Sequence, residues 1–225
     1  MDLDAFLAEL AAWAEEHDPG CETLAYGGDP DQVADVRRGG ERMAVLVHGG
    51  FWRPAFTRAN TRALAVDLAL RGWTTWNVEY RRTGLDDTLA DVEAALELTG
   101  PGVAIGHSAG GHLVLWAAGT GRIDKAVSLA GVTDLARAAR EGIGNNAAVE
   151  FAGAEPPEHA DPMHRLPLPV PALLVHGTED DRVPFDYSRS FAEASGAELL
   201  ELPGAGHFEP IDPRTPEWAA IVARL

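Results

Sequence analysis

The chain has 225 residues, of which 46% are hydrophobic and 24% are charged. This composition is that of a soluble globular protein and excludes disordered and fibrous classes. The formal net charge is −17, and so acidic a surface repels nucleic-acid phosphates and anionic lipid headgroups, so we expect neither as a partner. The single cysteine, Cys21, can form no internal disulfide and no zinc site by itself.

The first predicted element is a helix over residues 2–17, where apolar side chains recur at helical spacing before the stop signal Asp18-Pro19-Gly20. Acidic residues interrupt this pattern, which is unlike a secretory signal. No window of the chain approaches the roughly 20 apolar residues of a membrane span. We therefore expect a cytoplasmic protein and a helix that packs on the chain's own core, with a second subunit as the alternative. The oligomeric state stays open.

Apolar strand patterns then alternate with helical patterns along the chain. Residues 23–38 are a weak pattern that could supply the first strands. The later strands are expected at 43–48, 73–79, 102–107, 125–130, 171–176 and 197–202, and the helices at 58–71, 86–99, 109–119 and 186–195. This alternation predicts an α/β protein with a mostly parallel central sheet covered by helices on both faces. Near-continuous apolar runs such as AVLVHGG indicate strands that are buried on both sides.

Residues 134–168 break this alternation with short helical segments and several prolines. The stretch is too small to fold alone. We interpret it as a cap-like excursion from a single domain that covers residues 1–225.

The strongest chemical signal is the sequence GHSAG at residues 106–110, between an apolar strand and a helical pattern. It matches G-x-S-x-G in the strand–turn–helix context that gives this motif its meaning. The turn must be so tight that Ser108 adopts a strained backbone, and the flanking glycines let the strand and the helix approach. Ser108 is therefore the predicted nucleophile.

A serine hydroxyl needs a base to take its proton, and the partners should follow in the order acid, then histidine. A histidine, His207, comes directly after the last strand. Four acids compete for the remaining place, and we choose the one that is fifth in the turn HGTEDDRVP, with its neighbour as runner-up and as the expected cap of that turn. The chosen acid is Asp180 and the runner-up is Asp181. The other two candidates are Glu179 and Asp186.

An oxyanion hole is expected from the turn HGGFW, which follows the strand at 43–48. Glycines there allow backbone N–H groups to point at a substrate oxygen. We assign the donors to Gly50, Phe51 and Ala109, the residue after the nucleophile. His48, at the start of the turn, is predicted to be a structural hydrogen-bonding residue rather than a base.

Together these residues resemble the α/β-hydrolase superfamily over nearly the whole chain. The resemblance implies the α/β-hydrolase fold, with the excursion as a minimal cap after the sixth strand. The turn HGGFW is similar to the H-G-G-x-W motif of the kynurenine formamidase (arylformamidase) group and its esterase relatives. That similarity implies hydrolysis of a small carboxylic ester or an N-formyl aromatic amide, with Trp52 as a wall of the acyl pocket or, alternatively, packed beneath the loop.

The other histidines and one arginine have simpler expected roles. The histidines lack metal-ligand spacing and no H-E-x-x-H motif occurs, so we expect no metal, and the mechanism requires no cofactor. His112 is expected to be buried and hydrogen-bonded, and His176 to brace the turn that carries the acid. Arg81, near the mouth of the site, is expected in a structural salt bridge, with a substrate carboxylate as the alternative partner.

The predicted reaction is acyl transfer through an acyl-enzyme on a small, neutral molecule. The acidic surface disfavours polyanionic substrates. Two alternatives remain. One is a hydrolase-like protein that binds a small molecule without catalysis, and the other is a serine peptidase of the same fold, which usually carries a much larger substrate-selecting domain.

Overall fold

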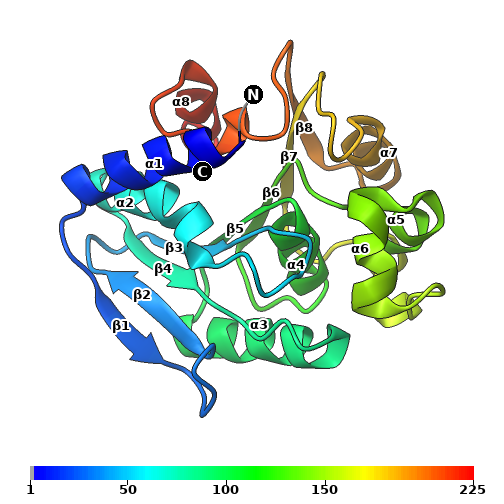
Figure 1. The fold of residues 1–225 in the computed structure, drawn as a ribbon, viewed down its shortest axis with the longest axis horizontal. Coiled ribbons are helices and arrows are strands. Elements are labelled where there is room, and N and C mark those ends of the chain that lie inside the picture. Colours follow the sequence, from blue (N-terminus) through cyan, green and yellow to red (C-terminus); the bar gives the residue numbers. More distant parts are fainter. Residues whose placement is uncertain (1–2) are drawn as a thin grey trace.

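The computed structural model describes residues 3–225, and this part of the chain forms one eight-stranded sheet in the order β1-β2-β4-β3-β5-β6-β7-β8 (Figure 1). Strand β2 is antiparallel to both of its neighbours, and all the other pairs are parallel. The predicted, mostly parallel sheet is thus confirmed, and the weak pattern at 23–38 forms β1 and β2. The strands are β1 Glu22–Ala25, β2 Val33–Arg37, β3 Met43–Val47, β4 Thr74–Val78, β5 Val103–His107, β6 Lys125–Leu129, β7 Ala172–Gly177 and β8 Glu198–Leu202.

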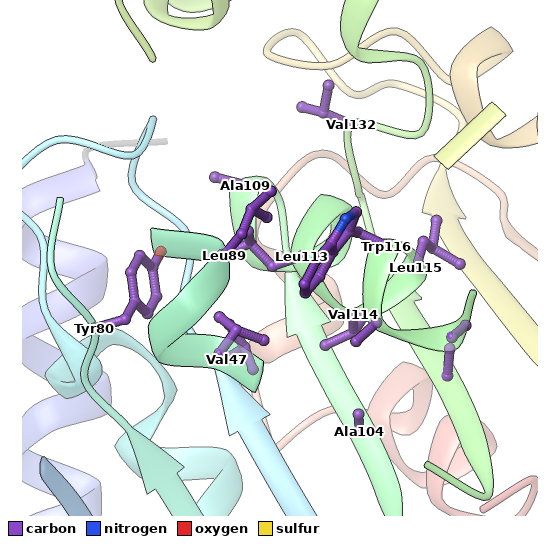
Figure 2. Packing of buried hydrophobic residues seen from close by; sticks show 14 of the residues in the cluster. Val47, Tyr80, Leu89, Ala104, Ala109, Leu113, Val114, Leu115, Trp116 and Val132 are labelled. Atoms are coloured by element: carbon purple, nitrogen blue, oxygen red, sulfur yellow. The ribbon is translucent and has the colours of Figure 1, made fainter. Parts of the chain in front are cut away.

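Successive residues of the central strands belong to two different cores, as the twofold side-chain period of a strand requires. On β3, Leu46 lies in the core beneath α1, α2 and α8, whereas Val47 lies in the core beneath α3 and α4. Figure 2 shows the second core, where Leu113 and Trp116 of α4 pack above the sheet. Helices therefore cover both faces. They are α1 Leu3–His17, α2 Arg62–Leu70, α3 Leu85–Thr99, α4 Ala109–Ala118, α7 Asp186–Ser195 and α8 Pro216–Val222.

The N-terminal helix α1 packs on this protein's own core, as expected. It buries Phe6, Leu10 and Ala14 in the same core as α2 and α8, and the three helices lie together in Figure 1. No helix within residues 3–225 has the length and apolar character needed to span a bilayer.

The stretch between β6 and β7 contains short helices, as the irregular pattern at 134–168 predicts. One segment of it, Gly144 to Asn146, has left-handed backbone angles, with φ between 57° and 64°. The elements of this stretch and the remaining short turns are α5 Leu135–Glu141, α6 Ile143–Ala152, η2 Glu158–Ala160, η3 Pro162–Arg165, η1 Arg58–Thr61 before α2, and η4 Glu209–Ile211 after β8.

Helix α8 has no counterpart among the predicted elements. It is only seven residues long, which is too short for a clear helical period. The signal that could have found it is its cap, where the Thr215 side chain accepts a hydrogen bond from the N–H of Trp218 and Pro216 stands at the first helical position. Trp218 is fully buried, and its indole N–H donates to Asp67 at 2.7 Å.

The parallel register brings the carboxyl ends of β3, β5, β6 and β7 to one edge of the sheet. Val47 pairs with Gly106, and Leu129 pairs with Val175. The loops that follow β3, β5 and β7 therefore emerge side by side, which is where open α/β sheets place their binding sites.

Candidate active site

Ser108 occupies a strained turn between β5 and α4. Its φ and ψ are 55° and −116°, a region that non-glycine residues rarely adopt and that clusters at functional sites. A side chain at Gly106 would collide with the carbonyl oxygen of Gly110, and one at Gly110 would collide with the carbonyl oxygen of Val47. The predicted strain, and the predicted reason for the glycines, are both confirmed.

Asp180 and His207 form a buried hydrogen-bonded pair. The Nδ1–H of His207 donates to Oδ2 of Asp180 at 2.7 Å, and this tautomer leaves Nε2 of His207 free to accept a proton. The other oxygen of Asp180 accepts the N–H groups of Arg182 at 2.8 Å and Val183 at 2.9 Å. Asp181, by contrast, has a side chain that is 79% exposed. Asp180 therefore caps its own turn, and the expectation that Asp181 does so is wrong.

The charge of Asp180 is held in place by its neighbours. Burial alone would raise the pKa of this carboxyl, but hydrogen bonds from His176 and His207 lower it far below its ordinary value. The Nε2 of His176 lies 3.1 Å from Asp180 and 2.9 Å from the carbonyl oxygen of Val183. His176 thus braces the turn, as expected, and Asp180 remains a carboxylate.

Ser108 and His207 line the same pocket. In the part of the chain that the structure describes, the Ser108 hydroxyl takes no part in the hydrogen bonds of His107 and His207, so it is available to a base or a substrate. Bonds between a nucleophile and its base are often formed only when substrate is present. The structure thus brings the hydroxyl, the imidazole and the carboxylate to one site.

The turn after β3 lies directly against Ser108. A side chain at Gly49 would stand 2.6 Å from the carbonyl oxygen of His107 and 2.9 Å from Cβ of Ser108. The next residues, Gly50 and Phe51, have φ of 115° and 58° and line the pocket with Ser108. A turn that is pressed onto the nucleophile in this way can present backbone N–H groups to an oxygen bound there.

The N–H groups of Gly50, Phe51 and Ala109 bond to no acceptor within residues 3–225. Ala109 is the first residue of α4, where the N–H is free by the geometry of a helix and carries partial positive charge. All three assigned donors are therefore available.

Trp52 does not reach this pocket. Its φ of 53° turns it beneath the loop, where it is 5% exposed and stacks on Phe151 of α6 with ring centroids 4.7 Å apart. It lines a separate hollow together with Arg82 and Glu150. Of the two expectations for Trp52, the structure agrees with the second: the side chain is packed beneath the loop and is not a wall of the acyl pocket.

The pocket wall consists mostly of residues that the sequence does not reveal. The cavity holds about 40 Å³, which is room for a few water molecules. Two of the further wall residues adjoin a recognisable catalytic position: His107 precedes Ser108, and Phe208 follows His207. The wall residues beyond the assigned ones are Leu3 and Leu7 of α1, Phe56, Asn60, His107, Arg182, Phe208 and Ile211.

His107, which occupies the variable position of the serine motif, supports the loop of His207. Its Nε2–H donates to the carbonyl oxygen of His207 at 2.9 Å, and the two rings lie 4.7 Å apart. Burial, and then the proximity of His207, lower the pKa of His107 to about 3. The neutral ring of His107 therefore holds the His207 loop in place and adds no charge to the pocket.

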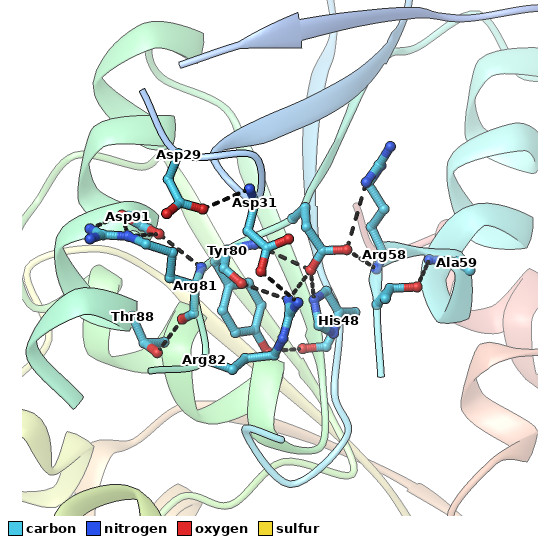
Figure 3. Close-up of polar contacts among 12 residues, drawn as sticks. Asp29, Asp31, His48, Arg58, Ala59, Tyr80, Arg81, Arg82, Thr88 and Asp91 are labelled. Atoms are coloured by element: carbon cyan, nitrogen blue, oxygen red, sulfur yellow. Dashed lines mark hydrogen bonds and ion pairs between the residues drawn. The ribbon is translucent and has the colours of Figure 1, made fainter. Parts of the chain in front are cut away.

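His48 anchors the turn after β3, which confirms its structural role. Its Nε2 lies 2.8 Å from Glu79, and its carbonyl oxygen accepts the hydroxyl of Tyr80 at 2.8 Å. The rings of His48 and Tyr80 stack 4.4 Å apart (Figure 3). Arg82 also pairs with Glu79, and the N–H of Arg58 donates to the same carboxylate at 3.0 Å.

Replacing Glu79 with glutamine is expected to destabilise the protein by about 3 kcal/mol at pH 7. Burial would raise the pKa of Glu79, but the hydrogen bond and charge of His48 lower it from 4.5 to about 2, and each unit corresponds to about 1.4 kcal/mol. Because the folded-state pKa is depressed, this stabilisation is present above about pH 4.5 and lost as the pH falls toward 2. Urea unfolding at pH 7, 4 and 3 measures it.

The matched control is Glu22→Gln, which removes a carboxylate from an exposed pair with Arg38 at 3.4 Å. An exposed pair contributes about 0 to 1 kcal/mol. Equal unfolding free energies for the Glu79 and Glu22 variants at pH 7 would contradict the argument.

Arg81 and His112 have the predicted structural partners. The guanidinium of Arg81 bonds to Asp91 at 2.6 Å and 2.9 Å (Figure 3), so its salt bridge is confirmed. His112 is fully buried and its Nε2–H donates to the carbonyl oxygen of Ala160 at 2.8 Å. Among residues 3–225, no group of three histidine, cysteine or acidic side chains could hold a metal ion.

Comparisons with known proteins relate the whole of this arrangement to hydrolases. The profile of the prolyl oligopeptidase family matches residues 77–208, more than half of the chain. The chain is 28% identical to esterase LipC of Mycobacterium tuberculosis over 82% of its own length, and it spans 58% of that relative.

Solved structures give the same relationship. A thermophilic esterase of Thermogutta terrifontis, esterase 2, is 25% identical with a TM-score of 0.70, covering 92% of this chain and 89% of its own. The same esterase has been solved with bound propionate and with bound butyrate, each covering 91% of this chain at 25% identity. A truncated carbohydrate esterase from gut microbiota has a TM-score of 0.76 at 17% identity, covering 93% of this chain and 96% of its own, which shows a shared fold.

Proposed function

Because the chain belongs to the prolyl oligopeptidase family and has the α/β-hydrolase fold, we propose that it is a serine hydrolase of small carboxylic esters. Ser108 is the nucleophile, His207 the base and Asp180 the acid of the triad. The observation that carries the proposal is the buried Asp180–His207 bond of 2.7 Å beside a strained serine in the same pocket.

The reaction proceeds in two halves. Nε2 of His207 takes the proton of the Ser108 hydroxyl as the oxygen bonds to the substrate carbonyl carbon, and Asp180 stabilises the resulting imidazolium. The N–H groups of Gly50, Phe51 and Ala109 stabilise the oxyanion. The bond to the leaving alcohol breaks, the alcohol takes the proton from Nε2, and water then repeats the sequence on the acyl-enzyme.

The size of the pocket favours a short acyl group. A cavity of about 40 Å³ lined by Leu7, Phe56 and Ile211 accommodates a few carbon atoms and gains by burying them. Esterase 2 of Thermogutta terrifontis is a relative that binds propionate and butyrate. A short-chain esterase is consistent with both observations.

Two other kinds of substrate, an N-formyl aromatic amide and a peptide, could be hydrolysed by the same three residues. The H-G-G-x-W resemblance favours an N-formyl aromatic amide, but Trp52 lies outside the pocket and offers that substrate no aromatic wall. The family description names an oligopeptidase, whereas the curated relative and the solved relatives are esterases. Esters are therefore the proposed substrates.

The test is a comparison of kcat/KM for p-nitrophenyl acetate, butyrate and octanoate with N-formylkynurenine and a chromogenic dipeptide amide. We expect the butyrate ester to exceed the octanoate ester by about tenfold or more, because an extra methylene that the pocket cannot hold loses roughly 1 kcal/mol or more. Rates for the formamide and the peptide should be lower than for the short esters. A formamide rate far above the ester rates would replace this proposal with an arylformamidase, and a dominant peptide rate would replace it with a peptidase.

Labelling by a fluorophosphonate separates catalysis from mere binding, because only an activated serine reacts rapidly with this probe. We expect stoichiometric labelling at Ser108. Absence of labelling and of turnover would indicate a hydrolase-like binding protein.

A further inference from the structure

One wall residue of the Ser108 pocket has a charge that the proposed chemistry does not use. Most of the wall is apolar, and outside the triad, His107 and the oxyanion turn its polar side chains are Asn60 and Arg182. Arg182 is the residue of this lining with a permanent positive charge, because a guanidinium stays protonated. The Arg182 side chain is 45% exposed, so it lines the open side of this mostly apolar pocket, where a ligand can reach its charge.

The guanidinium of Arg182 has no strong partner in the protein. Its Nε lies 3.4 Å from Asp181, in a pair whose side chains are 45% and 79% exposed, and such pairs contribute about 0 to 1 kcal/mol. Within residues 3–225 its side chain donates no other hydrogen bond. Arg81, in contrast, is engaged by Asp91 at hydrogen-bond distances. Arg182 can therefore exchange a weak contact with Asp181 for a ligand at little cost.

The position of Arg182 places it on the histidine side of the pocket. Its backbone N–H is held by Asp180 at 2.8 Å, two residues earlier in the same turn. It also lines the adjoining hollow, which it shares with His207 and Phe208. In the proposed mechanism His207 gives its proton to the departing alcohol, so a side chain that lines the pocket beside His207 lies on the side where the leaving group departs.

We propose that Arg182 binds a carboxylate on the leaving-group half of the substrate and thereby determines specificity. This inference rests on the proposed function and adds the substrate class: a short-chain ester of a hydroxy or phenolic acid. A guanidinium pairs with one carboxylate through two parallel hydrogen bonds.

The surroundings limit that substrate to a single negative charge. Glu179, Asp181 and Glu209 face the adjoining hollow, and one of them, Glu209, accepts the N–H of Gly206 at 3.0 Å. These carboxylates repel a second anionic group, as does the net charge of −17.

The experiment compares two butyrate esters that differ by one carboxylate on the leaving group. One is o-nitrophenyl butyrate, and the other is the butyrate ester of 4-hydroxy-3-nitrobenzoate. For each ester, kcat/KM of Arg182→Gln is divided by that of the unmodified protein, which cancels the intrinsic reactivity of the leaving group. We expect the quotient for the anionic ester to be about ten- to thirtyfold lower than for the neutral ester, which is the usual contribution of a charged hydrogen bond.

Two further variants distinguish specific binding of the substrate carboxylate by Arg182 from a general effect of the protein's net charge. Arg189→Gln also removes one positive charge, but Arg189 lies on α7 beside Asp186 with a side chain that is 56% exposed, and it does not line the pocket. Its two quotients should be equal. Arg182→Lys retains the charge without the planar fork, so it should recover part of the discrimination.

Equal quotients for Arg182→Gln on the two esters would overturn this inference alone. A selective loss on mono-p-nitrophenyl succinate, which carries its carboxylate on the acyl side, would overturn the placement on the leaving group. If the unmodified protein hydrolyses none of these esters, the proposed function fails and this inference fails with it.

Discussion

Replacing Ser108 with alanine is expected to lower kcat for p-nitrophenyl butyrate by about 10⁶-fold, because removal of the nucleophile from a triad costs about as much as removal of all three members. The variant should fold normally. Within residues 3–225 the Ser108 hydroxyl takes no part in the hydrogen bond between His207 and Asp180, so its removal leaves that pair intact. Steady-state kinetics and thermal unfolding measured together test both statements.

Ser128 provides the matched control for this variant. It is a buried serine on the neighbouring strand β6, and its hydroxyl has no partner. Ser128→Ala should therefore retain turnover within about threefold, because the residue does not line the pocket of Ser108. Hydrolysis of aryl esters by Ser108→Ala at the rate of the unmodified protein would exclude Ser108 as the nucleophile.

Replacing Asp180 with asparagine is expected to lower kcat by about 10⁴-fold, the loss seen when a triad carboxylate becomes an amide and the histidine adopts the wrong tautomer. The turn itself should persist, because an amide oxygen can still accept the N–H groups of Arg182 and Val183 that Asp180 now accepts. The melting temperature should also fall, because the hydrogen bonds of His176 and His207 that lower the pKa of Asp180 stabilise its charged form in the folded protein. The two kcat values are therefore compared at a temperature where the variant is fully folded.

Asp181→Asn is the neighbouring control. Its carboxylate is 79% exposed and makes a single loose contact with Arg182, so kcat on a neutral ester should change by less than about threefold. Small and equal losses in the two variants would show that neither is the acid of the triad, and a larger loss at Asp181 would reverse the assignment.

The helices and strands that can be predicted from the sequence are those whose bounds depend on residues close together in the chain. The strand before Ser108 and the helix after it end within a residue or two of their predicted bounds, because the apolar run and the glycines determine that turn locally. The choice of Asp180 over Asp181 also came from local turn chemistry. In contrast, the expected cap of that turn was assigned to the wrong carboxylate, because capping depends on where the side chain points.

The remaining features depend on contacts between residues far apart in the chain. The partner of His48 is Glu79, just after the end of β4. The pocket wall combines Leu7 of α1 with Ile211 near the other end of the chain. Trp52 shares a motif with the oxyanion turn, yet its backbone conformation and the ring of Phe151 decide that it lies beneath the loop.

By itself, then, the sequence predicted the strands, most of the helices and the residues proposed for catalysis, because short-range spacing encodes them. Only the tertiary structure decided what surrounds those residues: the weakly paired guanidinium of Arg182, the hydrogen bond of the His107 ring to the carbonyl oxygen of His207 and the two leucines of α1 in the pocket wall. The physical reason is that burial, packing and the electrostatic environment arise when separate segments meet, and no local pattern records which segments those are.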